Sequence, residues 1–177
     1  YVNAAMRLGT QEEPIARLTY EAETGQFVEE VGFAHTADGK FGLSVDGRVL
    51  PKGAVEIKTM VSSATLFKAL VDEDISEYRD QCVFALWVLR LQWVDLCLWA
   101  PDLPNPLKVI RITRDEAEIQ RLEDDMVAFD RLVCQYEASL RKAMGTEPTA
   151  APPWEAPTPA ASPAPTVAPG AIPAPAF

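Results

Sequence analysis

Two acidic residues and a lysine stand among apolar residues in the segment LSVDGRVLPKGAVEIKTM, residues 43–60. They are Asp46, Glu56 and Lys58, and the residues around them are typical of β-strands. Burying such charges costs free energy unless they are paired or bind a ligand. Two neighbouring carboxylates repel each other, and a divalent cation relieves the repulsion. Oxygen ligands without histidine or cysteine favour Mg²⁺ or Mn²⁺. A lysine beside them could polarise a water or stabilise charge on a phosphate.

The turn between the two expected strands decides which charged side chains share a face. If residues 51–53 form a three-residue loop with Gly53 in the left-handed region, Asp46 lies opposite Lys58. Glu56 then shares their face, because residues two apart on a strand point the same way. A two-residue loop would send Asp46 to the other face. The position of Gly53 favours convergence; an ordinary salt bridge between Lys58 and either acid is the structural alternative.

Four further segments are expected to position this hairpin. A capping box at Thr10 and Glu13 predicts a helix from about residue 10 to residue 20, with Pro14 in its first turn. Residues 76–90 have the pattern of a helix that is apolar nearly all round after Gln81, and therefore central. Residues 91–99 and 107–113 are typical of strands separated by a proline-rich turn. The pattern predicts a mixed α/β layer architecture.

The segment before the C-terminal tail has the clearest helical periodicity. Residues 115–144 are predicted to form a helix that Thr113 and Glu116 cap and that Gly145 ends. Its apolar residues recur at spacings of three and four, at Ile119, Leu122, Met126, Phe129, Val133, Tyr136, Leu140 and Met144. We expect this stripe to pack on its own domain; the alternative is a heptad that binds a partner helix.

Composition limits the remaining possibilities. The formal net charge of −10 argues against unspecific polyanion binding. Three cysteines without CxxC spacing indicate free thiols in a reducing compartment. No apolar run is long enough to span a bilayer, and no signal peptide is recognisable. Residues 146–177 are rich in proline and alanine and are expected to form a disordered tail after a core of residues 1–145. Because the chain starts at Tyr1, we expect part of its N-terminus to be missing.

The aspartate followed by Glu56-Ile57-Lys58 resembles the PD-(D/E)xK nuclease motif, and residues 2–144 are similar to the lambda exonuclease (YqaJ-type viral recombinase) family. VNAAMRLGTQEEPIAR resembles the family's helix with an upstream acidic residue, here Glu13. DGRVLPKGAVEIKT resembles its active-site hairpin, and EYRDQCVFALWVLRLQW the following helix with a glutamine, here Gln81. The resemblance implies a restriction-endonuclease-like core, a central mixed β-sheet flanked by helices.

The same resemblance implies a metal site for Mg²⁺ or Mn²⁺. Asp46, Glu56 and the backbone carbonyl of Ile57 would bind the ion. Glu13 would support a second ion or its waters, although its place in a capping box explains this residue equally well. The missing N-terminal segment would contribute to a pocket for the 5′-phosphate of DNA.

Other residues receive roles by the same resemblance. Lys58 would position the attacking water, and Gln81 would hold that water or the scissile phosphate; a polar residue near a helix start is the alternative. Ser62 and Ser63 could touch a DNA phosphate or could simply cap the next helix. His35, the only histidine, is expected to be a loop residue.

The function that the resemblance implies is a phage or prophage 5′→3′ exonuclease that degrades linear double-stranded DNA in recombination. It further implies a ring-shaped homotrimer around DNA, a single-strand-annealing recombinase as partner and the cytoplasm of a bacterial host as location. Alternatives are another PD-(D/E)xK nuclease, such as an endonuclease, or a catalytically silent scaffold.

Overall fold

A mixed four-stranded sheet carries the hairpin. The computed structural model describes residues 3–145, so the expected tail lies outside the described residues. The strands β3 (Gly47–Val49), β4 (Gly53–Thr59), β5 (Trp93–Trp99) and β6 (Leu107–Thr113) lie in this order across the sheet. Only the central pair, β4 and β5, is parallel, and both flanking pairs are antiparallel. A separate two-stranded ribbon joins β1 (Ala34–His35) to β2 (Gly42–Leu43).

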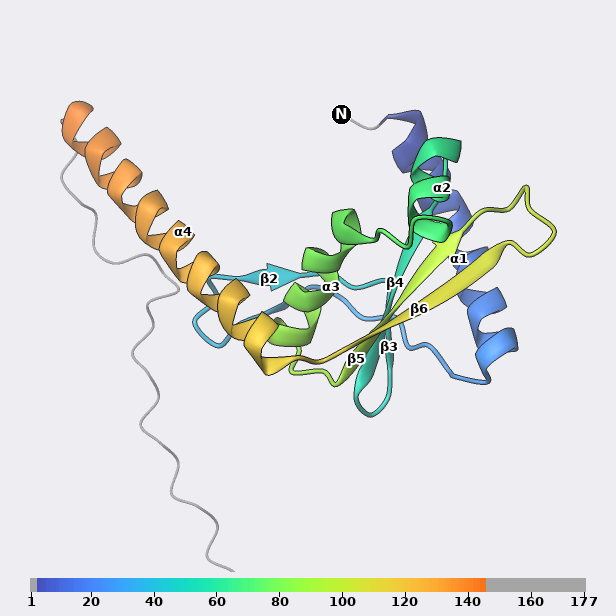
Figure 1. The fold of residues 1–177 in the computed structure, drawn as a ribbon. Helices are drawn as coiled ribbons and strands as arrows, with labels where there is room; N and C mark the ends of the chain where they lie inside the picture. The colour runs from blue at the N-terminus through green and yellow to red at the C-terminus, as the bar shows by residue number, and fades with distance from the viewer. Residues whose placement is uncertain (1–2, 146–177) are drawn as a thin grey trace, which may run out of the picture.

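Helices cover both faces of the sheet (Figure 1). On one face α1 (Ala4–Thr24) packs Ala16 and Tyr20 against the side chains of Val55 and Cys97. On the other face α3 (Ser76–Val88) packs against the alternate residues of the same strands, and a short helix, α2 (Ser63–Leu70), adds Ala69. Strands buried on both sides must be almost continuously apolar, as β5 is. The predicted mixed α/β fold, with its central mixed sheet and flanking helices, is confirmed.

The first helix starts earlier than predicted. The carboxamide of Asn3 caps α1 by accepting a hydrogen bond of 2.8 Å from the Met6 amide. The predicted start at Thr10 is wrong, because that hydroxyl lies within the helix and donates to the Met6 carbonyl. Pro14 is therefore an interior proline, which normally costs about 3 kcal/mol. The complete burial of Tyr20 against the sheet holds the helix in place despite that cost.

The hairpin register differs from both predicted alternatives. Val49 lies opposite Gly53, so residues 50–52, not 51–53, form the loop, and the Leu50–Pro51 peptide bond is cis. Continuing this register by one residue places Asp46 at the level of Glu56 instead of Lys58. Glu56 and Lys58 keep a common face of β4, because residues two apart on a strand point the same way. Asp46 lies in a bend just before β3, and its neighbour Val45 packs in the core cluster on the α3 side, so the strand register does not fix the face of Asp46.

Gly53 is the first residue of β4 and not the last residue of the loop. A Cβ atom at this position would lie 2.2 Å from the indole ring of Trp93, on the neighbouring strand β5. The glycine is required by this close approach rather than by a left-handed turn.

The long helix α4 (Glu116–Ala143) begins at a different cap from the predicted one. The carboxylate of Asp115, and not Thr113, accepts hydrogen bonds from the amides of Ala117 and Glu118, at 2.8 and 3.1 Å. Its end agrees with the prediction, because Gly145 adopts the left-handed conformation with φ of 65°.

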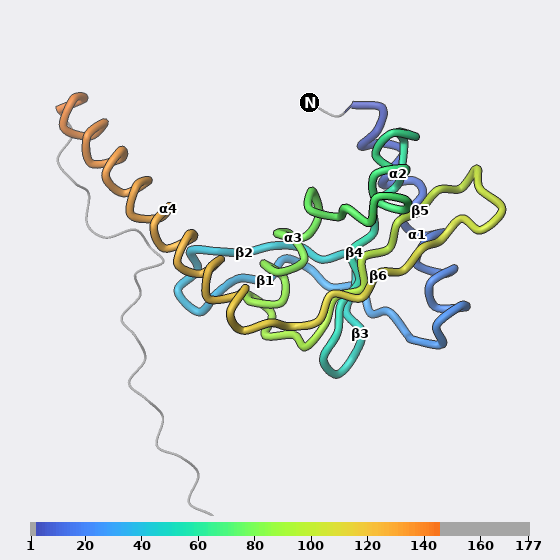
Figure 2. The backbone as a smooth tube through the Cα atoms, viewed as in Figure 1, coloured from blue at the N-terminus to red at the C-terminus, as the bar shows by residue number. Residues whose placement is uncertain are grey.

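The apolar stripe of α4 packs on its own domain only at the start of the helix. Ile119 is buried and Leu122 is half-buried, whereas every side chain from Phe129 onward in the stripe is exposed. The expectation that the whole stripe packs on the domain is therefore wrong. Figures 1 and 2 show α4 running away from the sheet after β6. No helix among residues 3–145 is long and apolar enough to cross a membrane.

Candidate active site

The hairpin brings the predicted acids to one place. Asp46 immediately precedes β3, and its Oδ2 atom accepts a hydrogen bond of 2.6 Å from the backbone amide of Ile57 in β4. This bond ties the end of one strand to the residue between Glu56 and Lys58. The side chains of those two residues lie on the face of β4 that is covered by α3, because they alternate with Ile57, which packs on the α1 side.

Glu56, Lys58 and Gln81 form a closed set of polar contacts. Glu56 is only 4% exposed, and its Oε1 atom lies 2.8 Å from the Lys58 ammonium. The same oxygen accepts a hydrogen bond of 2.6 Å from the Gln81 amide nitrogen. The amide oxygen of Gln81 in turn accepts one of 2.8 Å from Lys58. The first turns of α3 thus hold the Lys58 ammonium against Glu56, and the predicted proximity of Gln81 is observed.

The two carboxylates are poorly stabilised as anions. Burial, followed by the negative charge of Asp46, raises the pKa of Glu56 from 4.5 to about 7, although Lys58 and Gln81 act in the opposite direction. Burial also raises the pKa of Asp46, against the stabilising effects of the Ile57 amide and the Lys58 charge. A pair of acids in this state has a high affinity for positive charge.

Glu13 approaches the same region from α1. Burial and the charge of Asp46 raise its pKa, while Arg17 acts against them. The carboxylate of Glu13 lies 2.5 Å from the guanidinium of Arg17, which also binds Glu30. Because α1 starts at Ala4, Glu13 lies in the middle of the helix, and the capping-box explanation of this residue is excluded.

The donor atoms of this site suit a hard divalent cation. Among residues 3–145 there is no ready-made group of three histidine, cysteine, aspartate or glutamate side chains placed to hold a metal ion. Asp46 and Glu56 nevertheless supply two mutually repelling carboxylates, and backbone carbonyls or waters commonly complete such oxygen shells. The residues present therefore fit a Mg²⁺ or Mn²⁺ ion held by two side chains, with Glu13 close enough for the charge of Asp46 to raise its pKa.

Three other residues considered from the sequence are not joined to this network by any contact in the described structure. Ser62 caps α2, with its Oγ atom 3.4 Å from the Thr65 amide, and Ser63 is the first residue of that helix. His35 lies in β1 with an exposed ring whose Nδ1 atom is 2.7 Å from the Thr36 carbonyl oxygen. The capping alternative thus describes Ser62 correctly. The expectation that His35 is a loop residue is wrong, because it pairs with Gly42 in the β1–β2 ribbon.

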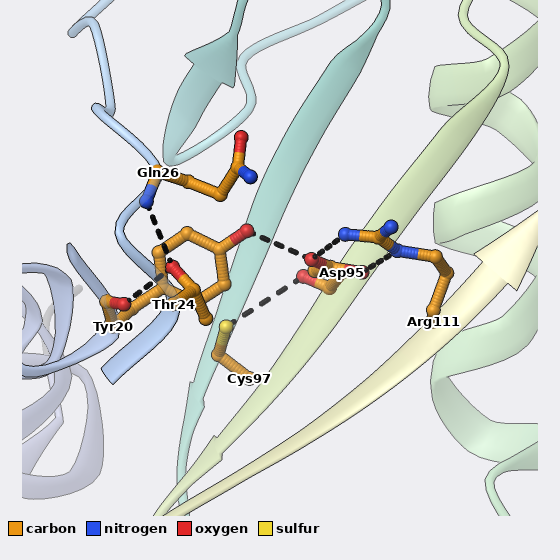
Figure 3. Close-up of polar contacts among 6 residues, drawn as sticks. All are labelled: Tyr20, Thr24, Gln26, Asp95, Cys97 and Arg111. Atoms are coloured by element: carbon orange, nitrogen blue, oxygen red, sulfur yellow. Dashed lines mark hydrogen bonds and ion pairs between the residues drawn. The ribbon is translucent and has the colours of Figure 1, made fainter. Parts of the chain in front are cut away.

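A second polar cluster anchors α1 to the sheet and was not predicted (Figure 3). Asp95 in β5 is 1% exposed and accepts hydrogen bonds from the Tyr20 hydroxyl at 2.7 Å and from Arg111 at 2.8 Å to each oxygen. Arg111 also stacks on Trp93, with its Cζ atom 3.9 Å from the ring centroid. The available signal was a single aspartate in the otherwise apolar run WVDLCLW. The cluster fixes the helix that carries Glu13.

Comparison with known proteins identifies the family and similar folds. Residues 1–92 match the model of the YqaJ-like viral recombinase domain. The chain is similar to the crystal structure of an alkaline exonuclease, LHK-Exo, from Laribacter hongkongensis, with 34% identity, a TM-score of 0.73, and coverage of 82% of this chain and 77% of that one. A structure of LHK-Exo in complex with dAMP gives 32% identity and a TM-score of 0.75, covering 82% and 76%.

A phage-related exonuclease from Haemophilus somnus 129PT has the same fold at 12% identity and a TM-score of 0.63, covering 77% of this chain and 75% of that one. A search of curated protein sequences finds no significant match.

Proposed function

Because the chain belongs to the YqaJ-like viral recombinase family of phage-type exonucleases, we propose that it degrades linear double-stranded DNA from its 5′ ends. The reaction would be Mg²⁺- or Mn²⁺-dependent hydrolysis of phosphodiester bonds in the 5′→3′ direction. The observation that carries the proposal is the pairing of two poorly stabilised carboxylates, Asp46 and Glu56, with the Lys58 ammonium at 2.8 Å from Glu56. That LHK-Exo has been crystallised with dAMP supports a nucleotide product.

Asp46, Glu56 and the carbonyl of Ile57 would hold the cation, and Glu13 would support a second ion or its waters. A bound divalent cation would neutralise the carboxylates and stabilise the charge that develops on the scissile phosphate. The amide of Ile57 keeps Asp46 fixed through its 2.6 Å hydrogen bond. Glu13 differs from Asp46, because its carboxylate already accepts a hydrogen bond from the Arg17 guanidinium.

Lys58 would position the attacking water and stabilise the charge on the phosphate oxygens. Its ammonium is aimed by two acceptors, Glu56 and the amide oxygen of Gln81. Gln81 therefore forms hydrogen bonds with both Lys58 and Glu56. Its side chain would also contact the water or the phosphate. Ser62 and Ser63, at the start of α2, would offer hydroxyl and amide groups to a neighbouring DNA phosphate.

We extend the proposal to an assembly that rests on the family resemblance alone. It would act as a homotrimer around DNA, supply the surviving strand to a single-strand-annealing recombinase, and work in the cytoplasm of a bacterial host. The net charge of −10 makes the divalent cation important for DNA binding as well as for catalysis.

The test is hydrolysis of a linear duplex with Mg²⁺, beside a closed circular duplex of the same sequence. Early release of a 5′ label as mononucleotide, with a 3′ label retained and the circle intact, is the expected result. Cleavage of the circle would favour an endonuclease of the same superfamily. Absence of cleavage of either DNA, with Mg²⁺ or with Mn²⁺, would favour the catalytically silent scaffold.

A further inference from the structure

The C-terminal half of α4 presents an apolar seam that the rest of the described chain leaves uncovered. We define the α4 seam as Phe129, Val133, Tyr136 and Leu140, whose exposed fractions are 59%, 44%, 63% and 62%. All residues from 131 to 140 are exposed, so this half of the helix touches little of residues 3–145. The helix runs clear of the sheet over this length (Figure 2).

A helix with an uncovered apolar face of this length is poorly stabilised in a monomer. A helix in a protein is stabilised mainly by packing of its apolar face, and the α4 seam has no such packing in residues 3–145. Ile119, near the start of α4 on the same apolar stripe, is only 4% exposed. The stripe that is buried at the start of the helix is therefore exposed to solvent in its C-terminal half. Leu132 and Met144 lie beside the seam and are 42% and 75% exposed. The continuous patch has the character of an interaction surface.

We propose that the α4 seam pairs with the α4 seam of a second copy in an antiparallel arrangement. Spacings of four, three and four make the seam complementary to itself when one helix is reversed. Phe129 then lies opposite Leu140 of the partner subunit, and Val133 opposite Tyr136 of the partner subunit. A two-fold axis passes between residues 134 and 135, so each contact occurs twice, as an isologous interface requires.

The position of the body favours the antiparallel direction. Residues 116–122 are attached to the body through Ile119 and through the Arg79–Glu118 ion pair of 2.6 Å, while residues 131–140 are exposed throughout in the described part of the chain. Antiparallel helices place the two bodies at opposite ends of the pair. A parallel pair would bring both bodies, each strongly acidic, to the same end.

The charged residues that flank the seam are compatible with pairing of two copies. In the antiparallel register the acids Asp130 and Glu137 of the two copies come near each other. Each already has a cation within its own chain: Lys40 lies 2.8 Å from Asp130, and Arg141 lies 2.6 Å from Glu137. Their repulsion is therefore reduced before association.

The size of the seam suits a modest dimer. Its four side chains and Leu132 would together cover roughly 500 Å² on each copy, hence about 1,000 Å² in total, which reaches the lower end of specific interfaces. Association is accordingly expected to depend on concentration. It is independent of the proposed nuclease activity, because it uses none of the residues of the candidate site.

Mass measurement by sedimentation equilibrium tests the pairing with the full chain. The double variant Val133→Glu/Leu140→Glu is expected to have half the mass of the wild-type assembly if the body is monomeric, and a lower mass than wild type if seams join larger assemblies of the body. The matched control Gln135→Glu/Ala138→Glu adds the same charge to the opposite side of α4 and should keep the wild-type mass. Circular dichroism checks that both variants retain their helices. Equal mass for wild type and the seam variant would overturn the proposal, whether the chain is monomeric or bound through another surface.

Cross-linking tests the direction. The variant Phe129→Cys/Leu140→Cys, in a Cys134→Ser background, holds thiols about 16 Å apart within one helix, too far for an internal disulfide. Mild oxidation should therefore produce a covalent dimer. The variant Tyr136→Cys in the same background should stay uncross-linked, because residue 136 faces residue 133 of the other copy. The double variant would also cross-link in a parallel pair, so the Tyr136→Cys variant decides the direction. Its cross-linking as readily as the double variant would indicate a parallel pair, in which residue 136 faces its own copy, and would refute the antiparallel proposal.

Discussion

Replacing Glu56 with glutamine is expected to stabilise the metal-free protein at alkaline pH, although the same change removes a proposed metal ligand. Glu56 is 4% exposed, and burial together with the charge of Asp46 raises its pKa to about 7. Glutamine has almost the same shape and carries no charge. Its amide oxygen can still accept a hydrogen bond from Lys58, so the fold should be preserved.

The direction in which the unfolding free energy changes with pH follows from the number of protons that the folded and unfolded states bind. Between pH 4.5 and about 7 the folded protein keeps the Glu56 proton while the unfolded chain has released it. The folded state thus binds more protons, and the free energy of unfolding falls as pH rises through this window. The two pKa values differ by about 2.5, and each pKa unit corresponds to about 1.4 kcal/mol, so the full loss is about 3.5 kcal/mol. The raised pKa of Asp46 adds a further loss of the same sign.

Urea denaturation in EDTA at pH 5 and at pH 8 measures this effect. The wild type should lose about 2.5 kcal/mol of unfolding free energy between the two through Glu56, and Glu56→Gln only the smaller part due to Asp46 and other acids. The control Glu23→Gln, at an exposed position of α1, should follow the wild type. Mg²⁺ at pH 8 should stabilise the wild type but not Glu56→Gln. An equal pH-dependent loss in Glu56→Gln and wild type would refute the assignment of a poorly stabilised carboxylate to this residue.

Three further substitutions test the packing that positions the site, each by urea denaturation. Gly53→Ala should destabilise the protein by about 1–3 kcal/mol, because the new Cβ would lie 2.2 Å from the Trp93 ring; an unchanged midpoint would mean that the ring moves freely. Gly9→Ala, at an open position of α1, should instead stabilise it by about 0.5–1 kcal/mol, and a loss would contradict the observed helix. Tyr20→Phe should cost about 1–3 kcal/mol by removing a hydrogen bond to buried Asp95, so a neutral result would mean that this carboxylate does not depend on the hydroxyl.

The approach of Asp46 to Glu56 and Lys58 could be predicted because a short hairpin keeps its two strands adjacent whichever turn joins them. The structure moves the hairpin register by two residues, yet Glu56 and Lys58 share a face of β4, and the Oδ2 atom of Asp46 still reaches the Ile57 amide between them. The loop itself could not be predicted from the glycine alone. What decides the place of Gly53 is the ring of Trp93, which approaches from a strand forty residues further along the chain.

The helix boundaries fail for a similar reason. Local capping patterns suggested starts at Thr10 and Thr113, whereas Asn3 and Asp115 provide the caps. Tertiary contacts of α1 outweigh the interior Pro14, and no local pattern reports such contacts. The stripe of α4 had the periodicity of a packed helix, but periodicity does not say which molecule covers the face.

The measurement that tests the central claim most directly is release of mononucleotides from a linear duplex in Mg²⁺ by wild type, Glu56→Gln and Glu23→Gln. If Asp46, Glu56 and Lys58 form the hydrolytic centre, wild type and Glu23→Gln should release nucleotides at similar rates. Glu56→Gln should show no release above the uncatalysed background while remaining folded by circular dichroism. Release at the wild-type rate by folded Glu56→Gln would contradict the account, because hydrolysis would then take place at another site.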